Sequence, residues 1–325
     1  MITAALLHLF GRQQGVAADR QLLDHVTRRQ IRRAVAIGLF ITELPGVRRL
    51  AGVPEEPPMR VSALSLYAGD SGFVSGMSAA RQLGVSCVPI EYYEVMISDR
   101  KDPHLPAWAT STRTAWRIDD DRRELANGVN VASPLRALFR CGATCSDVRF
   151  EKIAEQMWHR RLITPSEAHS YLELVRRQGR HGVLRFERWL EQAIERPRPS
   201  QSTLEVDLAA ALEAIGAPSP LRQFPLTLSN GELIHLDLAW PNAKLGLEPG
   251  ATFWHSGDEK IRSDHSRDRA CDEIGWRILR FDEVELRNVM ACAQQSLKIY
   301  RARACLQEFA RNVTPQEAHD FGKLL

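Results

Sequence analysis

Two acidic side chains, each at the end of a short apolar run, constrain the fold of this chain more than any other feature. Asp237 ends one run, and Glu248 follows the next run at residues 245–247. A proline–asparagine turn at residues 241–242 predicts two short strands that bring both carboxylates to one edge of a sheet. Neighbouring carboxylates repel unless a cation neutralises them, and hard oxygen ligands suit Mg²⁺ or Mn²⁺. The pattern therefore predicts a divalent-metal site with Asp237 and Glu248 as ligands.

A histidine follows the second acid by seven residues. His255 comes directly after the aromatic pair Phe253 and Trp254. An imidazole that titrates near neutrality could accept a proton from a metal-bound water, which would make Asp237, Glu248 and His255 a hydrolytic centre. The alternative is a histidine that packs behind Trp254 and has no catalytic role.

The order of these segments resembles the small Vsr-like branch of the PD-(D/E)xK nucleases. The matching order is strand–Asp237, strand–Glu248, the Phe-Trp-His segment, a helix reading DHSRDRA and a strand reading GWRILRF. The Ser-Thr-Leu-Glu segment at 202–205 matches the first acidic position of that family with Glu205, and the resemblance covers residues 200–288. It implies Mg²⁺-dependent hydrolysis of a DNA phosphodiester, with Glu205 orienting a metal-bound water and His255 as the base.

The chain departs from the pattern of these nucleases directly after the second acid. Relatives usually continue with a hydrophobic residue and then Asp-Gly, whereas this chain reads Pro249-Gly250-Ala251, and it has no lysine two residues after Glu248. The missing second acid favours an alternative in which the protein is a non-catalytic transcriptional regulator or antitoxin-like repressor with a degenerate nuclease fold. Both interpretations stay open at the level of the sequence.

Near the N-terminus, Thr27 is expected to cap an arginine-rich helix that Gly38 ends. A hairpin turning at Pro45-Gly46 should follow over residues 39–50. Three short helices and a basic hairpin are typical of a winged helix-turn-helix, in which the third helix enters the major groove and the wing contacts phosphate. The arginines expected to contact DNA are Arg28, Arg29, Arg32 and Arg33 on the helix, with Arg48 and Arg49 on the hairpin. The alternative is a solvated cationic face.

This N-terminal segment resembles the winged-helix head of AbiEi-type antitoxins. The matching residues are Gly15-Val16-Ala17, the arginine helix and Pro45-Gly46-Val47. The resemblance implies double-stranded DNA as a partner and leaves open a cognate toxin as another.

Two proline-rich stretches, at 54–58 and 195–200, divide the chain into three expected domains. These are a winged-helix domain (1–60), an α-rich connector with some β structure (61–195) and a Vsr-like α/β nuclease domain with a mixed sheet (196–325). The expected fold class is multidomain α+β. Arg267, in the helix after Glu248, could hold a DNA phosphate or pair with acids on its own helix. A helical tail at 286–306 could support a homodimer or pack against the connector.

The composition only restricts the possible partners and the location of the protein. The 325-residue chain carries a net charge of +3, so any nucleic-acid surface must be local. Its six scattered cysteines indicate reduced thiols, and it has neither a signal peptide nor an apolar run of 18 residues. We therefore expect a cytoplasmic protein with no membrane partner.

Overall fold

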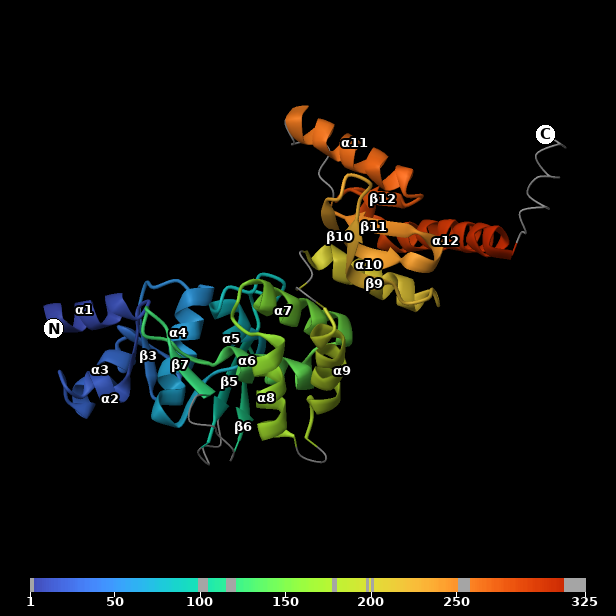
Figure 1. Ribbon diagram of the computed structural model, residues 1–325. Coiled ribbons are helices and arrows are strands. Elements are labelled where there is room, and N and C mark those ends of the chain that lie inside the picture. Colours follow the sequence, from blue (N-terminus) through green and yellow to red (C-terminus); the bar gives the residue numbers. More distant parts are fainter. Residues whose placement is uncertain are drawn as a thin grey trace, which may run out of the picture. The chain divides into compact units, whose positions relative to one another are not determined.

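The computed structural model describes residues 3–98, 105–114, 121–176, 180–196, 199, 202–250 and 258–312, without the side chains of 258–265 and 309–312. Helices and three sheets occur together, so the expected α+β class is confirmed (Figure 1). Contacts group the chain into two compact units, residues 1–191 and 192–325. The expected winged-helix and connector domains both fall in the first unit. Among the described residues, no helix is long and apolar enough to cross a membrane.

The first unit begins with a small helical layer and a three-stranded antiparallel sheet of order β1-β3-β2. Its elements are α1 (Ala4–Arg12), β1 (Val16–Ala18), α2 (Asp19–Leu22), α3 (Arg28–Ala36), β2 (Phe40–Leu44) and β3 (Val47–Leu50). Thr27 caps α3 as expected: its hydroxyl accepts a hydrogen bond from the Gln30 amide, and the Gln30 side chain accepts one from the Thr27 amide. Ile31 and Ala34 bury the inner face of α3 against Phe10 and Phe40.

The rest of the first unit contains a five-stranded mixed sheet of order β6-β5-β4-β8-β7. Its strands are β4 (Gly72–Val74), β5 (Tyr93–Ile97), β6 (Ala109–Arg113), β7 (Arg122–Glu124) and β8 (Asn130–Ala132). Its helices are α4 (Pro57–Ala68), η1 (Gly69–Ser71), α5 (Gly76–Gln82), α6 (Pro134–Thr144), α7 (Asp147–His159), α8 (Pro165–Val175) and α9 (Val183–Ile194). Three of the strands are only three residues long, too short to show an alternating pattern. The segment expected to be a proline-rich linker instead starts α4, because proline is tolerated in the first turn of a helix.

The second unit follows the order of elements expected from the sequence. Its elements are α10 (Thr203–Ala214), β9 (Leu221–Thr227), β10 (Leu233–Trp240), η3 (Pro241–Ala243), β11 (Leu245–Pro249), α11 (Asp258–Glu273), β12 (Arg277–Phe281), η4 (Glu285–Asn288) and α12 (Val289–Asn312). The sheet order is β12-β11-β10-β9. Strands β9, β10 and β11 are antiparallel, whereas β12 runs parallel to β11, so the sheet is mixed as expected.

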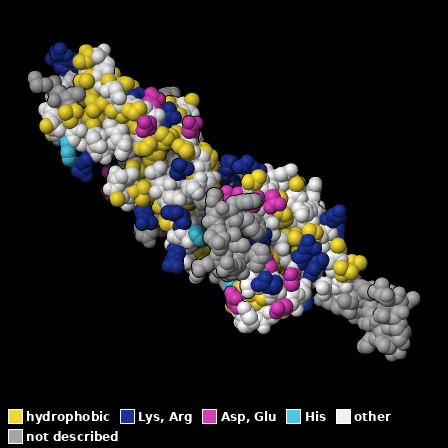
Figure 2. Space-filling view, turned by 90° about the horizontal axis from the view of Figure 1, so that it is seen from above, with side chains coloured by type: hydrophobic (Ala, Val, Ile, Leu, Met, Phe, Trp, Pro, Cys, Tyr) yellow, Lys and Arg dark blue, Asp and Glu magenta, His cyan; other side chains and the backbone are white. Residues whose placement is uncertain are grey.

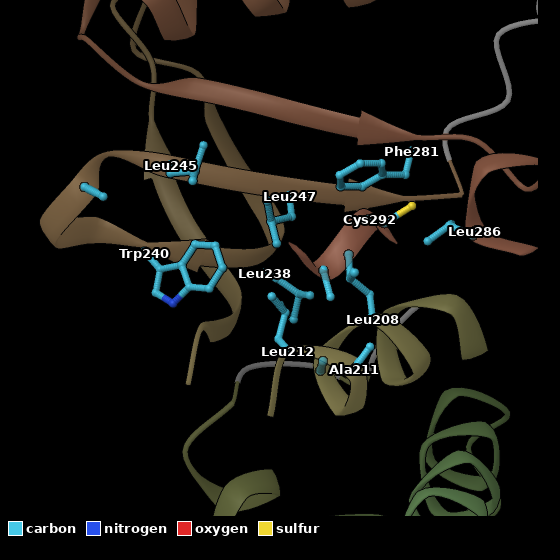
Figure 3. Close-up of a cluster of buried hydrophobic side chains, with 13 residues drawn as sticks. Leu208, Ala211, Leu212, Leu238, Trp240, Leu245, Leu247, Phe281, Leu286 and Cys292 are labelled. Atoms are coloured by element: carbon cyan, nitrogen blue, oxygen red, sulfur yellow. The ribbon is translucent and has the colours of Figure 1, made fainter. Parts of the chain in front are cut away.

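Helices cover both faces of this sheet. On one face, α10 and α12 pack on a core that includes Leu208, Leu238, Trp240 and Leu247 (Figure 3). On the other face, α11 packs Ala270 and Cys271 against the sheet. The tail helix α12 thus completes the core of its own unit.

Candidate functional site

The sheet of the second unit is irregular where Asp237 lies. Leu236 and Leu238 are two residues apart on β10, a spacing that puts side chains on one face of a regular strand. Here Leu236 packs on the α11 side and Leu238 on the α10 side. Gln223, the residue across from Asp237 on β9, has a φ of 50°, in the left-handed region that side chains other than glycine rarely adopt. The change of face on β10 therefore coincides with an unusual backbone conformation on β9, at Gln223.

The buried amide of Gln223 joins two of the three acids expected at the site. Its Nε2 donates to Glu205 Oε2 and to Asp237 Oδ1, at 3.0 Å in each case. Because both oxygens lie that close to one nitrogen, they are at most about 6 Å apart. Gln223 is 0% exposed and Glu205 is 1% exposed. Acids from the start of α10 and from β10 thus meet inside the unit.

The second oxygen of Glu205 stabilises its own helix. Glu205 Oε1 accepts a hydrogen bond from the Ser202 amide at 2.9 Å, and the Ser202 hydroxyl accepts one from the Glu205 amide at 3.4 Å. This reciprocal pair is a capping box. The Ser-x-x-Glu spacing of the sequence, which matches the first acidic position of the nucleases, is therefore also a helix-start signal.

Glu248 has a different set of partners. Strand register pairs Leu238 with Leu247, and one further step places Asp237 across from Glu248. The Glu248 carboxylate, however, accepts a hydrogen bond from Arg267 Nη2 at 2.5 Å and from Arg280 Nε at 3.1 Å. Arg267 comes from α11 and Arg280 from β12, so the two cations reach Glu248 from different elements.

The fit of Mg²⁺ or Mn²⁺ to these side chains is incomplete. The carboxylates of Glu205 and Asp237 supply the hard oxygens that such ions prefer. Both oxygens of Glu248 are held by arginines, and among the described residues no group of three His, Cys, Asp or Glu side chains is placed to hold a metal. The residues in this arrangement do not form the expected three-acid metal site, and we derive no hydrolytic step through an ion. His255, the expected base, lies outside the described residues.

The arginine-rich helix α3 presents its cations to solvent. Arg28, Arg29, Arg32 and Arg33 are all exposed, whereas Ile31 and Ala34 are buried. None of the four forms an ion pair with another residue in the described part of the chain. Elsewhere, positive side chains lie in several separate groups on the face shown in Figure 2, as the small net charge leads one to expect. The four arginines on α3 are close enough to repel one another, so an anion would stabilise them.

The two hairpin arginines are engaged within the protein. Arg48 makes a two-bond contact with Asp19, at 2.9 and 2.7 Å. Arg49 is 7% exposed, and its guanidinium donates to Glu43, to the Val53 carbonyl and to Glu55. Arg49 thus binds within its own unit through all three guanidinium nitrogens, and its contact with DNA stays a prediction.

Two residues that the sequence did not single out belong to the site. Gln223 holds two of the acids and Arg280 holds the third. A lone glutamine in a strand has no sequence signal that distinguishes it. Arg280 alternates with Ile278 on β12, so a register that puts Ile278 beside Gly246 also predicts Arg280 beside Glu248.

Comparison with known proteins adds little. No protein-family model matches the chain. Two proteins from two strains of Mycobacterium tuberculosis, each named only as an uncharacterized protein, are 28% identical to it over 106 residues. The match covers 33% of this chain and 38% of each relative, so the chain spans well under half the length of the curated relatives it matches. This similarity carries neither a family nor an activity to the chain.

Proposed function

We propose that the protein is a cytoplasmic DNA-binding protein whose second unit is a Vsr-like, Mg²⁺- or Mn²⁺-dependent endodeoxyribonuclease. The observation that carries this proposal is the meeting of Glu205 and Asp237 on one buried amide, Gln223. The αβββαβ order from α10 to β12, with its mixed sheet, supports the same proposal because it places Glu205 in the first turn of α10, Asp237 within β10 and Glu248 near the end of β11. Glu248, across from Asp237, is the third acid of the proposed centre.

The DNA-binding part of the proposal rests on α3. Its four arginines are exposed on a short capped helix that precedes a hairpin, β2–β3. A winged helix-turn-helix uses the helix in this position to enter the major groove, and arginines there contact phosphates and base edges. Arg48 lies on the hairpin but is paired with Asp19, so phosphate contact would require that it exchange partners.

A second function is favoured by the partners of Glu248. Two arginines neutralise this acid, and such a pair can stabilise a fold without any metal. A nuclease-type fold retained only for binding would give a transcriptional regulator or antitoxin-like repressor. The exposed arginines of α3 serve this function equally well, so DNA binding alone does not separate the two.

Cleavage of a supercoiled plasmid separates the two functions. The nuclease predicts Mg²⁺- or Mn²⁺-dependent nicking by the full chain, and His255→Ala should slow it by roughly 10²–10⁴-fold, the usual contribution of a general base, with little change in DNA affinity. Cleavage that persists undiminished in His255→Ala would remove that residue from the mechanism. Tight DNA binding without cleavage by either protein would establish the regulator instead.

A further inference from the structure

Helix α3 has one buried side, and this side determines where its arginines lie. Ile31 and Ala34 are 5% and 9% exposed, and Val35 packs beside them on the same core. At about 100° per residue, Arg29 and Arg33 lie roughly 150–170° around the helix from the middle of this buried side. These two arginines therefore occupy the face of α3 that is opposite the core.

The other two arginines lie on a flank of the same helix. Arg28 and Arg32 are about 70–110° around the helix from the middle of the buried side. The opposite flank carries Gln30, whose side-chain oxygen accepts hydrogen bonds from the amide and the hydroxyl of Thr27, at 2.8 and 2.9 Å. Because Gln30 is held by the helix cap, the polar surface of α3 consists of an outward pair and a flanking pair of arginines.

The outward pair has neither internal partners nor bulky neighbours on its face. In the part of the chain that the structure describes, Arg29 and Arg33 are exposed, and their side chains form no ion pair or hydrogen bond with another residue. Ala36, which follows on the same face, is exposed and has a small side chain that leaves room for a close approach. Each guanidinium thus keeps all five donors in a planar fork that matches two neighbouring acceptors.

We propose that Arg29 and Arg33 recognise guanines in the major groove, whereas Arg28 and Arg32 bind the phosphates beside them. The inference rests on the proposed DNA binding by α3 and names the kind of duplex that the helix prefers. Guanine presents two acceptors, N7 and O6, in the major groove, and one guanidinium can donate to both. Adenine presents one acceptor and one donor there, so it matches the fork less well. Arg29 and Arg33 are one turn apart, about 6 Å along the helix, which corresponds to about two base-pair steps.

The two pairs of arginines should affect DNA binding differently. A bidentate contact with guanine discriminates against the wrong base by about 5–150-fold. A phosphate contact acts alike on every sequence and contributes roughly 0.9 to the slope of log K against log salt. On a duplex without guanines, the outward pair has only phosphates to bind, so all four arginines then contribute to sequence-tolerant binding.

Fluorescence anisotropy with the full chain tests this division on three duplexes of equal length, in EDTA so that metal-dependent cleavage does not interfere. One duplex has a central run of guanines on one strand, the second has 7-deazaguanine in that run, and the third contains only A·T pairs. 7-Deazaguanine keeps the base pairing and the phosphates but lacks the N7 acceptor. Wild type is compared with the double variant Arg29→Ala, Arg33→Ala and with the matched double variant Arg28→Ala, Arg32→Ala, which removes the same charge from the same helix.

We expect wild type to bind the guanine duplex at least about tenfold more tightly than the A·T duplex, with the 7-deazaguanine duplex between them. Loss of Arg29 and Arg33 should abolish this preference. Loss of Arg28 and Arg32 should keep it and lower the salt slope on the guanine duplex by roughly 1.8.

Two kinds of result would contradict the proposal, and they have different meanings. Equal binding of wild type to the guanine and 7-deazaguanine duplexes, or a preference that survives the loss of Arg29 and Arg33, would overturn guanine recognition and leave the proposed DNA binding intact. Absence of wild-type binding to any of the three duplexes would overturn both.

Discussion

Gln223 and Asp237 face each other across β9 and β10, and the glutamine amide donates to the aspartate at 3.0 Å where the strand changes face. The same nitrogen is equally close to Glu205. A neutral side chain thus separates two acids in the interior of the second unit. The left-handed backbone of Gln223 costs about 1–2 kcal/mol for a residue with a side chain, and the interactions of Gln223 and of the surrounding fold offset this strain.

Replacing Gln223 with alanine should therefore destabilise the second unit by about 2 kcal/mol, because the buried Glu205 and the half-buried Asp237 each lose one hydrogen bond. Gln223→Gly loses the same amide but relieves the backbone strain, so it should be about 1 kcal/mol more stable than Gln223→Ala. Chemical denaturation of both variants measures these differences. A Gln223→Ala protein as stable as wild type would show that the bridge contributes nothing.

Glu248→Gln should lower the free energy of unfolding by about 2 kcal/mol. The change removes one of the two carboxylates that pair with Arg280, whose side chain is 8% exposed; the remaining pair with Asp268 and the partial exposure of Arg267 keep the loss below that of a fully buried pair. Asp272→Asn, at an exposed acid on α11, is the matched control and should be close to neutral. Equal effects of the two substitutions in urea unfolding would contradict the ion-pair account.

The arginines of α3 should supply the sequence-tolerant part of DNA affinity. If each neutralises one phosphate, the slope of log K against log salt should fall by roughly 0.9 for each arginine removed. Fluorescence anisotropy with duplex DNA over a range of salt concentrations measures the slope for the variant with Arg28, Arg29, Arg32 and Arg33 all changed to alanine. Arg123→Ala, at an exposed arginine on β7, is the control and should not move the slope. An unchanged slope in the quadruple variant would exclude α3 as the contact surface.

Tyr171 should make the first unit lose stability in alkali. Burial, together with the adjacent Asp121 carboxylate to which its hydroxyl donates at 2.9 Å, raises the pKa of Tyr171 above its ordinary value. Its contribution to stability is thus fully present below pH of about 10, where the unfolded side chain titrates, and is lost as pH rises toward the folded pKa. Tyr171→Phe should make the alkaline fall in unfolding free energy shallower by up to ~1.4 kcal/mol per pH unit.

A comparison of the same two proteins near pH 7 controls for the packing and hydrogen bond that Tyr171→Phe removes, since the unfolded side chain is not ionised there. Parallel stability curves for wild type and Tyr171→Phe above pH of about 10 would contradict the raised pKa.

Periodic segments made the second unit predictable. The capped helix α10, the apolar runs of β10 and β11 and the long helices α11 and α12 all carry strong local patterns, and the structure contains each of them. For the five-stranded sheet of the first unit the sequence predicted only some β structure, because β4, β7 and β8 are too short to show a pattern and are held by pairing between distant segments.

The sequence predicted the acidic residues of the candidate site but not the residues that contact them. Asp237 and Glu248 end apolar runs, and this position is visible in the sequence. Gln223 is placed by its own left-handed backbone in β9, and Arg280 by the parallel pairing of β11 with β12. Arg267 reaches Glu248 from α11, nineteen residues further along the chain. None of these three contacts has a local signal in the sequence. The Glu205 position is ambiguous in sequence because Ser-x-x-Glu is also a capping box.

The central claim, that the second unit hydrolyses DNA at a centre containing Asp237, is tested most directly by the rate of plasmid nicking in Mg²⁺ or Mn²⁺. Wild type, Asp237→Asn and the control Asp272→Asn are compared at equal DNA occupancy, and chelation of the metal provides the blank. We expect metal-dependent nicking by wild type and Asp272→Asn, and at least a 10²-fold slower rate for Asp237→Asn, as for loss of a group that acts in the transition state. Nicking by Asp237→Asn at the wild-type rate, or no nicking by wild type bound to DNA, would contradict the claim.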